Sequence, residues 1–175
     1  QQLEQGAPFS VYLSANQEWS DKLLAKKTCT PPAIPFAQGK LVLVAHTTEQ
    51  PTLVSLAKAK KIAVANPKLA PFGMAAMNAL EAMPDSKQLV SRVVFADNVM
   101  HALQLVDTGN AEVGLVSASL LDDARARLAL PHNIPLHLTA LLCRPDGQAL
   151  IEWLTNPATL QQRASAGLGV HCVAS

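Results

Sequence analysis

Three short stretches of this sequence bring hydrogen-bond donors to the ends of predicted strands. They are Pro71-Phe72-Gly73 after the strand 62–65, Asn98-Val99 after the strand 93–96, and Ser117 after the strand 113–116. The first amides of a helix have no partner inside the helix, and the helix dipole adds partial positive charge at the same end. A helix that begins directly after a strand therefore has the basic features of an anion-binding site.

The second of these stretches shows the pattern best. We expect Asp97 to be the N-cap of the helix that follows, because its carboxylate can accept a hydrogen bond from a free amide of the first turn. The apolar residues of this helix recur at i, i+3, i+4 and i+7, namely Val99, Ala102, Leu103 and Val106. Gly109 can take the left-handed conformation that ends a helix.

Enzymatic and metal-binding patterns are weaker. The neighbours His171 and Cys172 would point to opposite faces of a strand, and His137 and Cys143 are equally unconvincing as a dyad. Asp122–Asp123 fits a solvated pair better than an acid–base couple. The five histidines lack HxxxH and HExxH spacing, and GxSxG, P-loop and GxGxxG motifs are missing from the sequence. We expect no enzyme activity, no metal site and no cofactor.

The composition excludes several classes of partner. The chain has 175 residues, of which 49% are hydrophobic and 15% charged, so we expect an ordered chain with a sizeable core. A net charge of +1 and few aromatic residues argue against nucleic-acid and membrane-surface binding. No apolar run is long enough to span a membrane, and no signal peptide is visible. Because the chain begins at Gln1, we expect a processed or truncated product.

The three cysteines, Cys29, Cys143 and Cys172, give neither a disulfide framework nor a zinc pattern, because their number is odd and no CxxC spacing occurs. We expect ordinary buried or unpaired thiols. One disulfide remains possible, but the sequence does not choose its pair.

Hydrophobic periodicity and turn residues predict the order of elements. In the first half we expect the tail of a helix at 1–5, a strand at 9–13, a helix at 17–27 capped by Asn16, a proline-rich loop at 28–37, a strand at 41–45, a short helix at 51–58 and a strand at 62–65. In the second half we expect a helix from Pro71 that ends at Pro84, followed by strands at 93–96 and 113–116 on either side of the helix that Asp97 caps. Next we expect a helix at 120–130, with Arg125 and Arg127 solvated, and a long strand at 134–143. The chain should end with a helix starting near Asp146, another helix to about Ala166 and a short final strand.

The middle of the chain therefore alternates β-α-β-α-β. This order predicts a parallel sheet with helices on its faces. Ligands of such sheets bind beyond the carboxyl ends of the strands, where the three stretches above would meet.

Four blocks of the sequence, taken in order, resemble a known family. The ordered blocks EQGAPFSVYLSANQEWSDKL, GKLVLVA, NPKLAPFGMAA and ADNVMHALQLVDTGNAEVGLVSAS look like successive blocks of the periplasmic molybdate/tungstate-binding proteins, the substrate-binding components of ABC transporters. The resemblance covers nearly the whole chain. It implies an α/β, two-lobed periplasmic-binding-protein fold of the type II-like, venus-flytrap kind, here N-terminally truncated, with the oxyanion between the lobes. Residues 1–42 and 130–175 would form one incomplete lobe, and residues 43–129 the other.

The resemblance also implies a ligand set of neutral donors. The oxyanion-binding groups would be the backbone amides of Phe72 and Val99, and Ser117 stands where the family often has a Tyr. Ser117 is shorter than Tyr, so we expect it to reach the anion through water. Two hydroxyl donors of the family's first strand and first helix would lie ahead of Gln1.

The predicted function is binding of molybdate or tungstate in the periplasm, as a monomer, for delivery to the membrane permease of an ABC transporter. Two alternatives stay open. The chain could be a degenerate family member with impaired anion binding, or the effector-sensing domain of a transcriptional regulator, which uses the same fold. The choice between molybdate and tungstate is not visible in the sequence.

Overall fold

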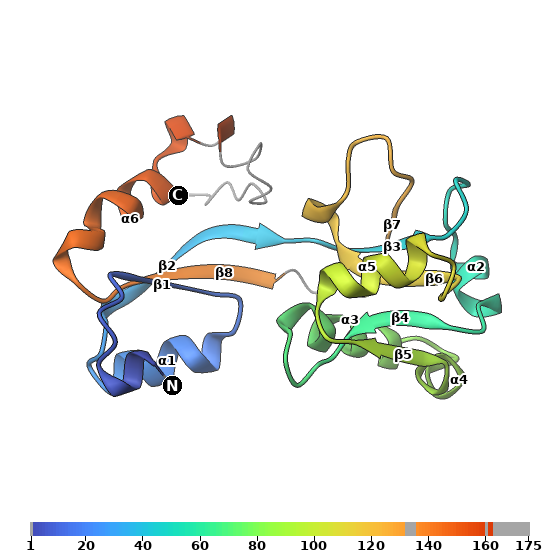
Figure 1. The fold of residues 1–175 in the computed structure, drawn as a ribbon, viewed down its shortest axis with the longest axis horizontal. Coiled ribbons are helices and arrows are strands. Elements are labelled where there is room, and N and C mark those ends of the chain that lie inside the picture. Colours follow the sequence, from blue (N-terminus) through green and yellow to red (C-terminus); the bar gives the residue numbers. More distant parts are fainter. Residues whose placement is uncertain (1, 132–135, 160, 163–175) are drawn as a thin grey trace. The chain divides into compact units, whose positions relative to one another are not determined.

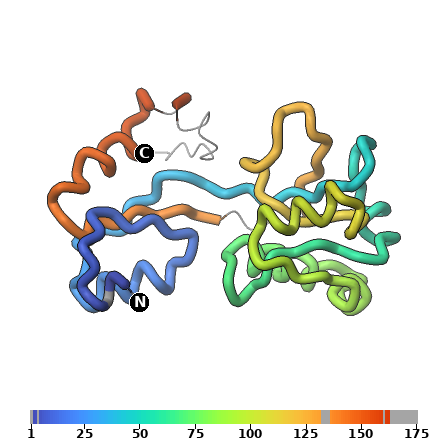
Figure 2. Tube along the Cα trace, viewed as in Figure 1, coloured from blue at the N-terminus to red at the C-terminus, as the bar shows by residue number. Residues whose placement is uncertain are grey.

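A computed structural model describes residues 2–131, 136–159 and 161–162 of the chain. The chain forms two compact units, unit 1 from residues 1–39 and 137–175 and unit 2 from residues 40–136 (Figure 1). Figure 2 follows the chain as it leaves unit 1 and returns to it after unit 2 is complete. The lobe boundaries expected after residues 42 and 129 lie close to this division and stay a prediction.

Unit 2 is built on a mixed five-stranded sheet with the strand order β5-β4-β6-β3-β7. Its elements in chain order are β3 (Leu41–Ala45), α2 (Leu53–Lys58), β4 (Ile62–Ala65), α3 (Pro71–Glu81), α4 (Ser86–Ser91), β5 (Val93–Ala96), α5 (Val99–Asp107), β6 (Val113–Ser117), the 3-10 helix η2 (Ala118–Leu120) and β7 (Leu128–Ala129). Strand β4 runs parallel to both β5 and β6, whereas β3 is antiparallel to β6 and β7. The predicted β-α-β-α-β core is confirmed, and α4 was not predicted.

The sheet of unit 2 is covered on both faces, which explains its continuous apolar strands. Leu43, Val64 and Leu115 point to one face and pack with α2, α3 and α4. Val44 and Val116 point to the other face and pack with α5. The left-handed Gly109 that was predicted to end α5 is confirmed, with a φ of 72°.

The helix predicted at 120–130 is wrong. Beyond η2 the chain forms a loop that ends in the two-residue strand β7. The guanidinium group of Arg125, expected to be solvated, donates to the carbonyl of Ala45 at 3.0 Å and to the carboxylate of Asp107 at 2.8 Å. These bonds to other elements, together with the pairing of β7 to β3, favour an extended loop over a local helix.

Unit 1 contains a three-stranded sheet with the order β1-β8-β2. Its elements in chain order are the 3-10 helix η1 (Leu3–Gln5), β1 (Val11–Ser14), α1 (Gln17–Ala25), β2 (Thr30–Gly39), β8 (Leu136–Leu142), η3 (Pro145–Gly147), α6 (Gln148–Thr155) and η4 (Pro157–Thr159). The predicted cap of α1 is confirmed, because the side chain of Asn16 accepts from the amide of Glu18 at 2.9 Å. The final strand and the end of the last predicted helix fall outside the described residues.

The proline-rich loop predicted at 28–37 is wrong, because most of it belongs to β2. This strand lies at an edge of its sheet. Proline cannot donate to a neighbouring strand, but an edge strand needs donors on one side only, so prolines are tolerated there. Pro31 and Pro32 are also at the exposed start of the strand.

The expectation of unpaired thiols is wrong for two of the cysteines. Cys29, just before β2, and Cys143, just after β8, form a disulfide across a sequence separation of 114 residues. The two strands are neighbours in the sheet, so the folded chain brings the two thiols together. Cys172 lies outside the described residues.

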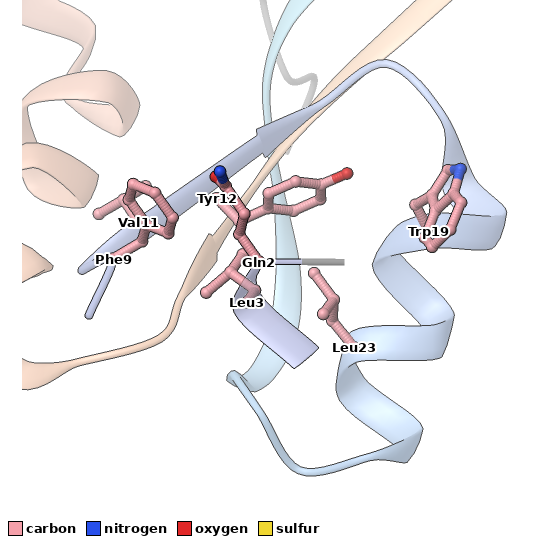
Figure 3. A pocket seen from close by; sticks show the side chains of 7 residues that line it. All are labelled: Gln2, Leu3, Phe9, Val11, Tyr12, Trp19 and Leu23. Atoms are coloured by element: carbon pink, nitrogen blue, oxygen red, sulfur yellow. The ribbon is translucent and has the colours of Figure 1, made fainter. Parts of the chain in front are cut away.

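Unit 1 also has an apolar cavity of about 540 Å³ beside β1 and α1 (Figure 3). Its lining residues are Gln2, Leu3, Phe9, Val11, Tyr12, Trp19 and Leu23. Phe9 and Trp19 are also exposed, and Lys22 lies 4.4 Å from the centre of the Trp19 ring. A dianion needs a dense set of donors, so this mostly apolar lining does not suit one.

Candidate functional site

The three predicted stretches do meet at one edge of the sheet of unit 2. Ala65 pairs with Ala96, and Val64 pairs with Leu115, so the parallel strands β4, β5 and β6 end on the same side. We call this side the carboxyl edge. Helix α3 begins after β4, helix α5 begins after β5, and Ser117 is the last residue of β6. The structure therefore brings Phe72, Val99 and Ser117 to the same edge.

The loop between β4 and α3 is held by hydrogen bonds of Asn66. Its amide donates to the carbonyl of Ala96 at 2.7 Å, which ties the end of β4 to the end of β5. Its side-chain oxygen accepts from the amide of Lys68 at 3.0 Å, and its carbonyl accepts from the amide of Ala70 at 2.9 Å. This turn fixes the direction in which α3 starts.

The first turn of α3 leaves the amide of Phe72 open. Pro71 begins the helix and has no N–H, which suits a first helical position. The amides of Gly73 and Met74 both donate to the carbonyl of Ala70, at 2.9 and 3.2 Å. For the amide of Phe72 the structure records no acceptor among the described residues. It is the first open donor of the helix.

The cap of α5 is one residue later than predicted. The side-chain oxygen of Asn98, not that of Asp97, accepts from the amide of His101 at 2.9 Å. Asn98 is the extended residue directly before the helix, with φ −152° and ψ 176°, and this is the geometry of an N-cap. Asp97 instead lies beside the ring of His101, with 3.5 Å between its Oδ2 and Nδ1.

With His101 engaged by this cap, the open donors of α5 are the first two amides of the helix. The amide of Ala102 donates to the carbonyl of Asn98 at 3.0 Å, as the first bond inside the helix requires. No acceptor is recorded in the described part of the chain for the amides of Val99 and Met100. The predicted donor Val99 is thus available.

Ser117 is buried at the end of β6, with 5% of its surface exposed. Its Oγ lies 2.8 Å from the Oγ of Ser119, an exposed residue of η2. Ser119 was not among the predicted site residues. The only signal for it in the sequence was a second hydroxyl two residues after Ser117.

Asp97, just after β5, and Lys68, in the loop before α3, are charged residues at the carboxyl edge, whereas the open donors themselves are uncharged backbone amides and a hydroxyl. The pKa of the Glu112 carboxyl is lowered mainly because the backbone amide of Lys61 donates to it, but Glu112 precedes β6 and lies at the opposite edge. Exposed apolar side chains flank the open amides, namely Leu69, Met74 and Met100. Within the described residues, no group of three or more His, Cys, Asp or Glu is arranged to hold a metal ion. The carboxyl edge therefore offers neutral hydrogen-bond donors.

Comparison with known proteins assigns the family. Residues 1–167 match the model of the bacterial extracellular solute-binding proteins. This chain belongs to that family. It is 30% identical to the molybdate-binding protein ModA of Azotobacter vinelandii over 97% of this chain and 74% of that protein. It is 27% identical to the molybdate-binding protein ModA of Rhodobacter capsulatus over 91% of this chain and 69% of that protein.

The fold of this chain also matches that of a solved structure. The periplasmic molybdate-binding protein of Azotobacter vinelandii superposes with a TM-score of 0.79 at 24% identity, covering 97% of this chain and 82% of that one. The family and the α/β, two-lobed fold class predicted from the sequence are confirmed. Members of the family are described as extracellular solute-binding proteins of bacteria. None of the helices in the described part of the chain combines the length and apolarity that crossing a bilayer requires.

Proposed function

We propose that this protein binds a tetrahedral oxyanion, molybdate or tungstate, in the periplasm and delivers it to the permease of an ABC transporter. The two relatives named above carry molybdate binding in their names, and both align with most of this chain. The proposed ligand groups of unit 2 are the amides of Phe72 and Val99 and, through a bridging group, the hydroxyl of Ser117.

The observation that carries the proposal is the convergence of open backbone amides on one edge. Phe72 and Val99 come from different helices, yet both amides lie at the carboxyl edge without a recorded acceptor in the described part of the chain. Taking a dianion out of water is costly, so almost every oxygen must regain hydrogen bonds. Bonds from amides to a charged oxygen each contribute about 1.5–3 kcal/mol, so several such donors offset that cost.

The same donor set favours an anion without a proton. A backbone N–H can donate but cannot accept, so a fully deprotonated oxyanion satisfies every donor. Hydrogen phosphate also carries an O–H, which needs an acceptor. The amides of Phe72 and Val99 cannot accept it, so among the proposed groups only a serine hydroxyl could. We therefore expect molybdate and tungstate to be preferred over phosphate.

Val99→Pro is the sharpest test of this site. Val99 is the first residue of α5, where the missing N–H of proline removes no bond of the helix. The extended conformation of Asn98 is also the one that a residue before proline prefers. The substitution therefore deletes the proposed donor and little else. Val99→Ala is the matched control, because it shortens the side chain and keeps the amide.

The measurement is the dissociation constant for molybdate, tungstate, sulfate and phosphate by isothermal titration calorimetry. We expect binding of molybdate and tungstate by the wild type and by Val99→Ala. For Val99→Pro we expect a dissociation constant about 10- to 150-fold higher, the equivalent of one charge-assisted hydrogen bond. Equal affinities of a folded Val99→Pro variant and the wild type would reject this amide as a ligand.

A further inference from the structure

Ser117 and Ser119 form a hydroxyl pair at the carboxyl edge, and the two hydroxyls differ in exposure. Their Oγ atoms are 2.8 Å apart. Ser117 is 5% exposed, whereas Ser119 is open to solvent. A serine hydroxyl has one hydrogen to donate and two lone pairs to accept with, so one of the two must donate to the other.

Burial decides the direction of this bond. If Ser119 donated to Ser117, the hydrogen of Ser117 would need another acceptor, and none is recorded for it among the described residues. A buried donor without a partner costs about 1–3 kcal/mol. If Ser117 donates to Ser119, its hydrogen is satisfied and the hydroxyl hydrogen of Ser119 remains available at the surface. The second direction is therefore favoured.

We propose that Ser119 donates its hydroxyl hydrogen directly to the bound oxyanion, and that Ser117 is the positioning residue that holds the Ser119 oxygen in place. The inference rests on the proposed function and refines it. The sequence predicted that Ser117 reaches the anion through water, and here the bridging oxygen is that of Ser119. Accepting a bond from Ser117 also polarises the Ser119 hydroxyl and makes it a better donor.

The backbone around Ser119 is held by hydrogen bonds on both sides. The amide of Ala118 donates to the carbonyl of Lys40 at 2.8 Å, which joins η2 to the start of β3. The amide of Leu121 donates to the carbonyl of Ala118 at 3.2 Å and closes the turn. A donor on such a fixed turn loses little conformational freedom when the anion binds.

The test compares molybdate affinity in the wild type, Ser117→Ala, Ser119→Ala, Ser119→Thr and the double alanine variant. Calorimetry with sodium molybdate gives the dissociation constants, and thermal unfolding without ligand shows whether each variant is folded. We expect Ser119→Ala to weaken binding about 10- to 150-fold. Ser119→Thr keeps the hydroxyl and should bind nearly as the wild type does.

The double variant separates the two roles. Ser117 acts only through Ser119, so Ser117→Ala should cost less than Ser119→Ala, and the double variant should bind no more weakly than Ser119→Ala alone. Wild-type affinity in Ser119→Ala, or losses that add in the double variant, would overturn the proposal. Val99→Pro is measured alongside these variants. If it weakens binding while Ser119→Ala does not, the proposed function stands and this inference falls. A wild type that binds none of the anions overturns both.

Discussion

Replacing Gly73 by alanine should displace the start of α3, although alanine is the better helix former. A Cβ atom at this position would lie 2.2 Å from the carbonyl oxygen of Ala65 and 2.9 Å from the carbonyl carbon of Asn66. A carbon–oxygen contact normally needs about 3.3 Å or more, so the helix must move by about 1 Å. Its neighbour β4 is fully buried and cannot yield. Overpacking of this kind costs about 1–3 kcal/mol, against a gain in helix propensity of about 1 kcal/mol at most.

A mid-range overpacking cost of about 2 kcal/mol less a propensity gain of about 1 kcal/mol leaves a net loss of about 1 kcal/mol. In a chain of this size 1 kcal/mol shifts the melting temperature by about 2–4 °C, so we expect Gly73→Ala to melt about 2–4 °C below the wild type. Molybdate affinity should fall about tenfold, because the amide of Phe72 moves with the helix. Met74→Ala is the control: Met74 is the next residue but is 45% exposed, and the melting temperature should hardly change. A Gly73→Ala variant that melts at or above the wild type would refute the close contact between α3 and β4.

Two further predictions concern stability. Asn98→Ala removes the cap of α5 and should lower the free energy of unfolding by about 0.5–2 kcal/mol, whereas Asp97→Ala should change it by less than about 0.5 kcal/mol. Denaturant unfolding measures both free energies. A larger loss in Asp97→Ala than in Asn98→Ala would show that Asp97 is the cap. Reduction of the Cys29–Cys143 disulfide should lower the free energy of unfolding by about 2–5 kcal/mol. A variant with serine at both positions should melt at the same temperature with and without reductant, and a wild type insensitive to reductant would contradict the pairing.

The sheet of unit 2 was predictable because its signals are local. Strands such as Leu41–Ala45 and Ile62–Ala65 are short runs without a polar residue, and such runs indicate burial on both faces. Their alternation with amphipathic helices then predicts parallel neighbours. Together these local signals locate the carboxyl edge.

The wrong predictions have a common physical cause. Each of these parts of the structure depends on a residue or strand that is distant in sequence. Pro31 and Pro32 are compatible with β2 only because that strand lies at a sheet edge. The loop around Arg125 is held by groups of β3 and α5. The pairing of Cys29 with Cys143 depends on which strands are neighbours. Local propensity contains none of this information.

The candidate site likewise contains groups that the sequence predicts and groups that it does not. Phe72 and Val99 would act through backbone amides, so their positions follow from where helices start after strands, and side-chain identity is not needed. The shift of the cap from Asp97 to Asn98 leaves this result unchanged, because Val99 remains the first residue of the helix. The hydroxyl pair is different, because its use depends on which oxygen is buried and on a turn that brings residues two apart into contact. In a site of neutral donors, topology therefore predicts the amides, whereas the side-chain donors have to be read from the folded structure.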